Sequence, residues 1–256
     1  MDPRHVLILG GTGEARQLAQ ALVREPVLRV TLSLAGRTAA PREQAGEVRI
    51  GGFGGADGLA RYIRENGVCI LVDATHPFAA RVSENAALAA EETRTPLVKL
   101  ERPPWQPVEG DRWTEAASVG HAAELLGETP RRVFLAIGRQ ELLPFRGRPQ
   151  HFYIVRSVDP ADPKEVPPHA QFILERGPFD EKAERALLES HDVEIVVAKN
   201  SGGEATYGKI AAARALGLPV IMVQRPCPPT EGGVTIVEEA IGRIRHLAGL
   251  PAERGE

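Results

Sequence analysis

The chain has 256 residues, 43% of them hydrophobic and 25% charged, which is enough for one large or two small globular domains. Its formal net charge of −3 argues against a general nucleic-acid binder, which would be strongly basic. Two cysteines far apart in sequence exclude a disulfide scaffold and predict a reduced, cytoplasmic setting with no metal site. We expect neither a signal peptide nor a membrane span, because no apolar window reaches the required length.

Short runs rich in Val, Ile and Leu alternate with amphipathic stretches in the first part of the chain. The predicted strands cover residues 6–9, 29–34, 48–50, 68–72 and 97–100, and the predicted helices cover 14–24, 57–66 and 79–92. Near-continuous apolar strands separated by helices indicate a parallel sheet with both faces covered. The segment 101–113, with three prolines and both tryptophans, is predicted to be a linker.

The alternation then resumes to the end of the chain. The predicted strands cover residues 133–137, 152–156, 172–175, 194–198 and 220–224, and the predicted helices cover 116–126, 180–190, 207–216 and 236–247. The predicted fold class is therefore α/β, with two Rossmann-like domains built on mostly parallel sheets. We expect residues 1–104 to form the first domain and residues 105–256 the second.

A glycine-rich turn joins the first predicted strand to the first predicted helix, in the sequence ILGGTGEAR. Glycines remove side chains where a phosphate must approach the backbone, and the helix start offers free N–H groups. The dinucleotide fingerprint is imperfect, because Arg16 stands where its third glycine belongs. The alternative is a tight turn without a ligand. The candidate cofactor-binding residues here are Gly10, Gly11, Thr12, Gly13 and Arg16.

The end of the second predicted strand bears on the kind of cofactor. NAD-binding folds usually place an acid there, whereas this chain has Ser33, followed by Gly36, Arg37 and Thr38. A hydroxyl and a guanidinium suit a 2′-phosphate, which a carboxylate would repel. These four residues therefore favour NADPH over NADH. Alternatively, Arg37 is a solvated loop residue.

The fourth predicted strand runs into the sequence DATHPFA, which contains Asp73 and His76. Both residues lie just past the carboxyl end of a strand, where open α/β sheets bind ligands. The alternative is a structural helix cap with an exposed histidine.

In the second half, Gly203–Lys209 has the spacing of a phosphate-binding loop, GEATYGK. Ile210 stands where that loop needs a Ser or Thr for magnesium, so ATP or GTP hydrolysis is not expected. The loop is still basic and glycine-rich at a helix start, which suits an anion. The candidate anion-binding residues are Lys199, Ser201, Gly202, Gly203 and Lys209.

A basic residue lies at or beside the end of every predicted strand of the second half. If these strands are parallel, the five charges meet at one edge of the sheet and predict a ligand with several carboxylates. The alternative is five solvated loop charges. The five residues are Arg139, Arg156, Arg176, Lys199 and Arg225.

Taken together, ILGGTGEARQLA, SLAGR, DATHPFA, AKNSGG with TYGKI, and ALGLPVIMVQRP make the chain resemble the precorrin-6A reductase family of cobalamin biosynthesis. The resemblance spans about residues 6–226. It implies two α/β domains with a cleft between them, and NADPH-dependent reduction of one ring double bond in a tetrapyrrole rich in carboxylates. It leaves open whether the substrate contains cobalt. Adjacent enzymes of the pathway are further candidate partners.

In this interpretation, candidate proton donors are His76, Tyr207 and Asp73, with Lys209 less favoured. Arg139, Arg176, Lys199 and Lys209 would hold substrate carboxylates, together with backbone N–H groups of Ser201–Gly203. Two alternatives remain. A short-chain-type reductase would need its tyrosine and lysine four positions apart, whereas Tyr207 and Lys209 are two apart. A regulator that senses NADP(H) would bind the cofactor without turnover.

Overall fold

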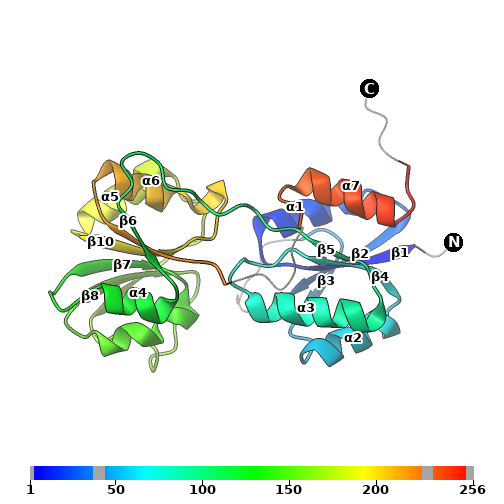
Figure 1. Ribbon diagram of the computed structural model, residues 1–256, viewed down its shortest axis with the longest axis horizontal. Helices are drawn as coiled ribbons and strands as arrows, with labels where there is room; N and C mark the ends of the chain where they lie inside the picture. Colours follow the sequence, from blue (N-terminus) through cyan, green and yellow to red (C-terminus); the bar gives the residue numbers. More distant parts are fainter. Residues whose placement is uncertain (1–2, 37–43, 227–232, 252–256) are drawn as a thin grey trace. The chain divides into compact units, whose positions relative to one another are not determined.

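The computed structural model describes residues 3–36, 44–226 and 233–251. It divides into two compact units (Figure 1). The first unit contains Met1–Pro103 and Pro226–Glu256, and the second contains Pro104–Arg225. Each unit has one sheet, and every strand pair recorded in either sheet is parallel. The predicted α/β fold class is therefore confirmed.

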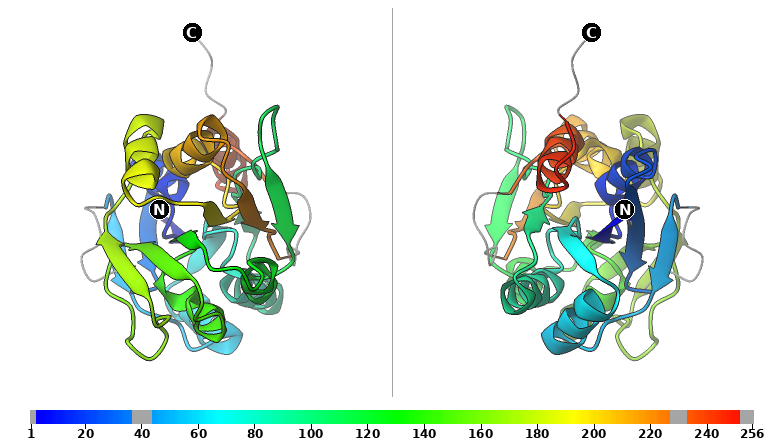
Figure 2. Two further views of the ribbon diagram at one scale, coloured as in Figure 1. Left: turned by 90° about the vertical axis from the view of Figure 1, so that its left-hand side faces the viewer. Right: turned by 90° about the vertical axis from the view of Figure 1, so that its right-hand side faces the viewer.

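The first sheet has the strand order β3-β2-β1-β4-β5. Helices α1 and α7 cover one face, and α2 and α3 cover the other (Figures 1 and 2). The bounds are β1 Arg4–Leu9, α1 Gly13–Leu22, β2 Leu28–Leu34, β3 Glu47–Ile50, α2 Ala56–Glu65, β4 Val68–Asp73, α3 Ala80–Thr93, β5 Leu97–Lys99 and α7 Val237–Leu247.

The core of the first unit follows from helical spacing. Helix α1 buries Ala15, Leu18, Ala19 and Leu22, which recur every three to four residues and so line one side of the helix. These side chains pack against the sheet and against Ile244 of α7. Apolar side chains are buried on both faces of the sheet. A slip of one residue in a strand would exchange the side chains that pack against the two helix layers, so this packing favours one register.

The C-terminal segment belongs to the first unit, which corrects the predicted second domain of residues 105–256. Val234 forms a parallel bridge with Leu100, beyond β5. Its N–H donates to Lys99 O at 2.8 Å, and its carbonyl accepts from Glu101 N at 3.0 Å. The amphipathic pattern of α7 indicates a buried stripe but does not specify which sheet it covers. The predicted boundary near residue 104 agrees with the first crossing of the chain.

The second sheet has the strand order β6-β11-β10-β7-β8-β9. Helices α5 and α6 lie on one face and α4 on the other (Figure 1). The bounds are β6 Trp113–Ala116, α4 Val119–Leu125, β7 Arg132–Ala136, β8 Phe152–Ser157, β9 Ala170–Leu174, α5 Glu181–Ser190, β10 Ile195–Lys199, α6 Gly208–Ala215 and β11 Val220–Val223, with short 3₁₀ helices at Arg139–Glu141, Leu143–Gly147 and Glu204–Thr206.

Strand β6 was not predicted, because its sequence WTEA lacks an apolar run. It begins at the end of the predicted linker and ends where a helix was expected to start. Its parallel pairing with β11, from Trp113 opposite Val220 to Ala116 opposite Val223, defines it as a strand. Tertiary pairing thus overrides a weak local preference.

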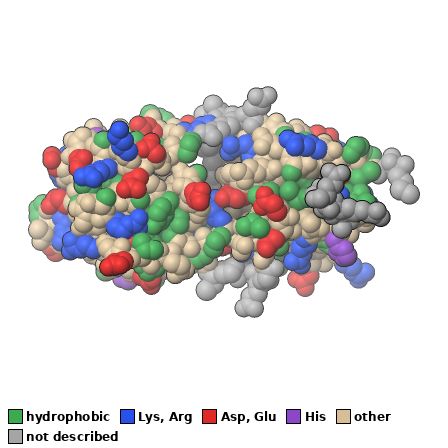
Figure 3. Space-filling model, turned by 90° about the horizontal axis from the view of Figure 1, so that it is seen from above, with side chains coloured by type: hydrophobic (Ala, Val, Ile, Leu, Met, Phe, Trp, Pro, Cys, Tyr) green, Lys and Arg blue, Asp and Glu red, His purple; other side chains and the backbone are tan. Residues whose placement is uncertain are grey.

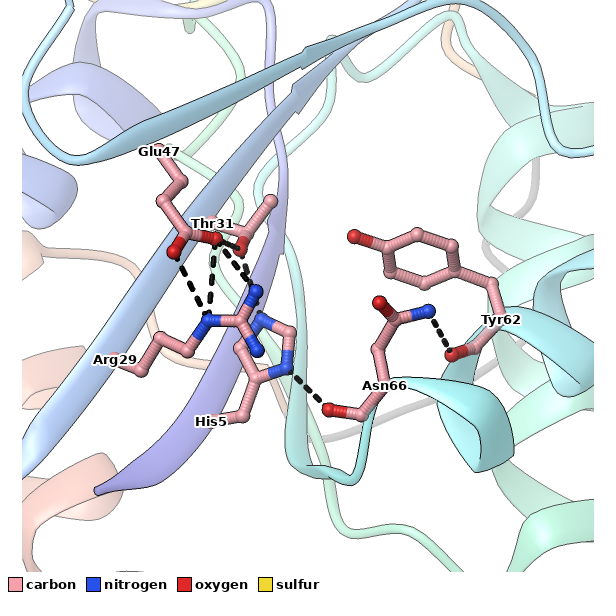
Figure 4. A network of polar contacts seen from close by, with 6 residues as sticks. All are labelled: His5, Arg29, Thr31, Glu47, Tyr62 and Asn66. Carbon is pink, nitrogen blue, oxygen red and sulfur yellow. Dashed lines mark hydrogen bonds and ion pairs between the residues drawn. The ribbon is translucent and has the colours of Figure 1, made fainter. Parts of the chain in front are cut away.

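A polar network joins the beginnings of β1, β2 and β3 in the first sheet (Figure 4). The buried His5 ring lies 2.9 Å from Asn66 O through Nδ1 and 2.8 Å from Thr31 Oγ1 through Nε2. Thr31 lies 3.0 Å from a carboxylate oxygen of Glu47, which also pairs with Arg29 at 2.9 Å. Burial is the main cause that lowers the pKa of His5. The network lies at the amino edge of the sheet, away from the edge where such sheets bind ligands.

Candidate functional site

The first sheet has its topological switch point between β1 and β4. From β1 the chain continues to β2 on one side, and from β4 it continues to β5 on the other. In open α/β sheets, ligands bind at the carboxyl ends of the two strands that flank this point. The loop after β1 holds the glycine turn, and the loop after β4 holds the DATHPFA segment. Thr12 joins the loops, since its hydroxyl donates to Ala74 O at 2.8 Å.

The glycine turn is packed on one side and open on the other. A side chain at Gly10 would collide with Leu32, whose Cδ1 lies 2.6 Å from the ideal Cβ position. Gly11 has a φ of +116°, which L-residues rarely adopt. At Gly11 and Gly13 an added Cβ would meet nothing within 4 Å. The open side lies at the start of α1, where N–H groups without helical partners suit an anion.

Residues flanking the turn hold α1 in place. Thr12 is the N-cap, and its side-chain oxygen accepts from Ala15 N at 3.1 Å. Glu14 pairs with Arg102 at 2.7 Å. Arg16 lies in the second turn of the helix, and its Nε has no hydrogen-bond partner among the described residues.

Asp73 is buried at the end of β4 and has a structural task. One of its carboxylate oxygens accepts from the Thr75 hydroxyl at 2.7 Å and from Thr75 N at 3.2 Å. This geometry is an Asx turn, which shapes the loop after β4. Helix α3 begins only at Ala80, one residue after the predicted start at 79, so the residues 74–79 form a loop. Asp73 therefore positions the loop, and its geometry does not favour a proton donor.

His76 lies in the same loop, and its Nδ1 accepts from Phe78 N at 3.2 Å. Because the backbone N–H can only donate, Nδ1 carries no hydrogen in this arrangement. The ring hydrogen of the neutral imidazole is then at Nε2. His76 thus presents a hydrogen-bond donor from a loop at the switch point.

The end of β2 carries Ser33, which is buried and faces the next strand. The register places it opposite Arg49 of β3, and Arg49 Nη1 lies 3.4 Å from Ser33 Oγ. Gly36, also predicted for the cofactor site, has a φ of +73°. The other two predicted residues, Arg37 and Thr38, lie outside the described residues. Arg49 was not predicted, although a basic residue within β3, one position before the end of the strand and the GGFGG loop, was a usable signal.

The second sheet has its switch point between β7 and β10, since the chain leaves β7 toward β8 and β10 toward β11. Lys199 ends β10, and its Nζ lies 2.6 Å from a carboxylate oxygen of Glu141, in the loop after β7. Arg139 in that loop donates to Pro160 O at 2.7 Å and lies 3.8 Å from Asp159. The parallel strands thus bring Lys199 and Arg139 to one edge, as expected.

Arg156 does not lie at that edge. The prediction that five basic residues meet at one edge of the second sheet is therefore wrong for Arg156. Its side chain is buried and pairs with Glu184 of α5. Its guanidinium lies 3.7 Å from the ring centre of Phe179 and 5.1 Å from that of Phe134. Residue 156 lies inside β8, which continues to Ser157, so its side chain points to a helix-covered face.

The last two of the five differ in their surroundings. Arg176, beyond β9, is exposed, and no ion pair or hydrogen bond to it is recorded in the described part of the chain. Arg225, beyond β11, donates from Nε to Asn200 O at 2.8 Å. Arg176 remains a candidate for a substrate carboxylate, whereas Arg225 helps to hold the loop after β10.

The segment that mimics a phosphate-binding loop folds differently from one. Gly208 packs so tightly that an added Cβ would lie 2.5 Å from Phe179 O. Lys209 is buried in α6, and its Nζ lies 4.7 Å from the ring centre of Trp105. Ser201 N donates to Lys199 O at 2.7 Å, so this N–H is already used. The geometry favours neither Lys209 nor the Ser201 N–H as a carboxylate ligand.

Tyr207 also differs from its predicted role. Its hydroxyl accepts from Arg214 at 2.9 Å, and Arg214 pairs with Asp111 at 3.3 Å. The ring packs on Trp105 at a centroid distance of 5.7 Å. This arrangement makes Tyr207 a packing residue at the N-cap of α6 and does not favour a proton donor.

Asn200, at the carboxyl end of β10, is a residue that sequence reasoning missed. Its side chain accepts from Trp105 N at 2.8 Å and donates to Trp105 O at 3.0 Å. Its carbonyl accepts from Arg225. Trp105 and Arg225 lie beside the two places where the chain passes between the units. Asn200 therefore anchors both connecting segments to the loop that follows Lys199.

The described residues also bear on metal sites and membrane spans. They contain no group of three His, Cys, Asp or Glu side chains arranged to hold a metal ion. No helix within the described ranges is long and apolar enough to cross a bilayer. Basic and acidic side chains are interspersed over the face shown in Figure 3.

The glycine turn and the strand order β3-β2-β1-β4-β5 define a doubly wound α/β protein with a Rossmann-like sheet. A model of the family described as Precorrin-6x reductase CbiJ/CobK matches residues 5–245. The chain belongs to this family, which confirms the resemblance predicted from the motifs and the expected class of oxidoreductase.

Similar proteins span nearly the whole chain. A precorrin-6A reductase of Sinorhizobium sp is 54% identical, over 96% of this chain and 94% of the relative. A cobalt-precorrin-6A reductase of Priestia megaterium is 33% identical, over 86% of this chain and 90% of the relative. A solved structure named CobK precorrin-6A reductase is 43% identical, with a TM-score of 0.92, and covers 99% of this chain and 100% of the other.

Proposed function

We propose that the chain reduces one ring double bond of precorrin-6A with NADPH in cobalamin biosynthesis. The observation that supports NADPH as the cofactor is the glycine turn at the switch point of the first sheet, which is packed on one side and open on the other. Gly11 and Gly13 leave open space at the start of α1, and Thr12 fixes the turn against the loop after β4. NADPH supplies a hydride when bound. Gly10–Gly13 and the start of α1 would hold its pyrophosphate.

The second unit would bind the substrate through its carboxylates. Lys199 and Arg139 lie at the switch point of the second sheet, and the exposed Arg176 follows β9. Charge-assisted hydrogen bonds from such side chains to carboxylates are roughly twice as strong as neutral ones. These three residues form the proposed carboxylate-binding set.

The substrate we favour lacks cobalt. A relative named precorrin-6A reductase is 54% identical to this chain, whereas one named cobalt-precorrin-6A reductase is 33% identical. The metal-free macrocycle is therefore the substrate to test first.

His76 is the side chain we propose to act near the reacting atoms. With Nδ1 accepting from Phe78 N, its neutral ring offers Nε2–H as a hydrogen-bond donor. Such a donor orients a ligand and stabilises charge that develops during hydride transfer. Asp73 and Thr75 hold its loop in place. This proposal gives His76 a polarising role and does not require it to release a proton.

Gly13→Asp tests the cofactor site. The position begins α1 and has open space around Cβ, so the variant should fold with an unchanged Tm. Its carboxylate would occupy the open space proposed for the phosphate, and we expect the Kd for NADPH to rise by about tenfold or more, equivalent to about 1.4 kcal/mol.

The matched control is Gly13→Ala, which adds a small uncharged group and should weaken binding less. Titration calorimetry of both variants gives the measurement. An unchanged Kd in Gly13→Asp would remove the glycine turn from the cofactor site.

A further inference from the structure

We propose that Arg49 is a specificity-determining residue that, with Ser33, selects NADPH over NADH by binding the 2′-phosphate. This inference rests on the proposed function and assigns a role to a residue that was not among the predicted cofactor-binding residues. Arg49 stands opposite Ser33 in the pairing of β2 and β3. Ser33 stands where NAD-binding folds place the acid that binds the ribose hydroxyl, and Arg49 lies beside it on the neighbouring strand.

The guanidinium of Arg49 is fixed in position. Nη1 donates to Gly51 O and lies 3.4 Å from Ser33 Oγ, and Nη2 donates to Gly52 O at 2.8 Å. The guanidinium carbon lies 3.7 Å from the ring centre of Phe53. A cation held in this way has lost most of its freedom before a ligand arrives, which lowers the entropy cost of binding.

The positive charge of Arg49 has no carboxylate partner within the described residues. Other arginines of the same unit do, since Arg29 pairs with Glu47 at 2.9 Å and Arg64 with Glu92 at 2.8 Å. The three contacts of Arg49 are to neutral oxygens and leave two of its five N–H groups uncommitted. A fixed guanidinium with spare donors and an uncompensated charge suits a phosphate.

The position of Arg49 relative to the glycine turn indicates which phosphate of the cofactor it would bind. Gly10 N donates to Ser33 O at 2.9 Å, so the turn and the end of β2 are joined directly. A dinucleotide with its pyrophosphate at Gly10–Gly13 has its adenosine ribose at the end of the second strand. The group that distinguishes NADPH from NADH on that ribose is the 2′-phosphate. Ser33 and Arg49 then replace an acid that would repel it.

The experiment compares Arg49→Met with the wild type and with the control Arg64→Met, an exposed arginine of α2. The Kd values for NADPH and for NADH are measured by titration calorimetry on the full chain. We expect Arg49→Met to raise the Kd for NADPH by about tenfold or more and to leave that for NADH within about twofold. Arg64→Met should change neither value.

Arg49→Lys covers the case in which Arg49→Met does not fold. It keeps the charge but loses the planar fork, and we expect it to reduce the preference for NADPH severalfold. Equal weakening of both cofactors, or an unchanged ratio of the two Kd values, would overturn the role of Arg49 while the proposed function stands. Failure of the wild type to bind NADPH would instead overturn the proposed function.

Discussion

Lys199 and Lys209 lie ten residues apart, and burial gives them different tasks. Lys199 ends a strand at the ligand edge and pairs with the half-exposed Glu141. Lys209 is a buried residue of α6, and its Nζ lies near the ring of Trp105. A buried lysine with aromatic and backbone contacts contributes to packing, whereas one beside an exposed carboxylate can exchange that partner for a ligand.

Lys199→Ala should weaken binding of precorrin-6A by about 1–3 kcal/mol, because a charged hydrogen bond to a substrate carboxylate is lost. Its Kd for NADPH should stay the same. Glu141→Gln is the matched control, since it frees Lys199 without removing its charge and should bind the substrate at least as tightly. Equilibrium titrations of both ligands give the measurement, and unchanged substrate binding in Lys199→Ala would contradict the proposed carboxylate-binding set.

The sequence predicted which charged residues lie near strand ends, but it did not predict which of their side chains are buried. Arg156 matched the pattern of a basic residue after a strand, yet Glu184 from a helix 28 positions further on neutralises it inside the unit. Arg49 lies 16 positions beyond Ser33 and becomes its neighbour only through strand pairing. Contacts of this kind depend on sheet register, which local patterns do not fix.

At the scale of elements, the network at the amino edge ties β1, β2 and β3 together through one ionisable ring. Burial lowers the pKa of His5, so the folded chain resists a proton that the unfolded chain takes up near the ordinary value of 6.5. The free energy of unfolding should therefore fall as the pH is lowered through 6.5. His151, whose pKa is also lowered mainly by burial, acts in the same direction.

Urea unfolding at about pH 7.5 and about pH 5.5 tests this. His5→Gln should lose less stability between the two pH values than the wild type does, whatever its absolute stability. His246→Gln, an exposed position on α7, is the control and should behave like the wild type. If His5→Gln retains the full pH dependence, His5 does not stay neutral in the folded chain.

Most strands and helices began or ended within one to three residues of their predicted positions, because apolar runs and helical spacing are local signals. Strand β6 was not predicted, because WTEA contains no apolar run and forms a strand only through its pairing with β11. Helix α7 was located correctly but placed in the wrong unit. The sequence shows that a helix has an apolar stripe, whereas the partner of that stripe is a property of the whole chain.

At the scale of the molecule, the chain leaves the first unit after Pro103 and returns at Pro226. The returning segment adds the Leu100–Val234 bridge and covers α1 with α7. The first unit therefore needs both ends of the sequence to complete its core. The candidate cofactor site at the start of α1 depends on residues more than 200 positions away.

Ile244→Ala tests this dependence. Ile244 is fully buried in α7, and its truncation should cost about 2–5 kcal/mol. Hydrogen exchange should then speed up in β1 and α1 and stay unchanged in β7 and β10, because only the first unit loses packing. Faster exchange in β7 and β10 instead would place α7 in the core of the second unit.

We propose that this chain transfers a hydride from NADPH to precorrin-6A. The most direct test mixes the purified chain with both compounds under anaerobic conditions and follows the absorbance of the cofactor and of the macrocycle together. We predict that one NADPH is oxidised for each macrocycle reduced, and that Gly13→Asp slows both changes alike. Binding of both compounds with no loss of NADPH would contradict the claim and would favour a protein that senses the cofactor.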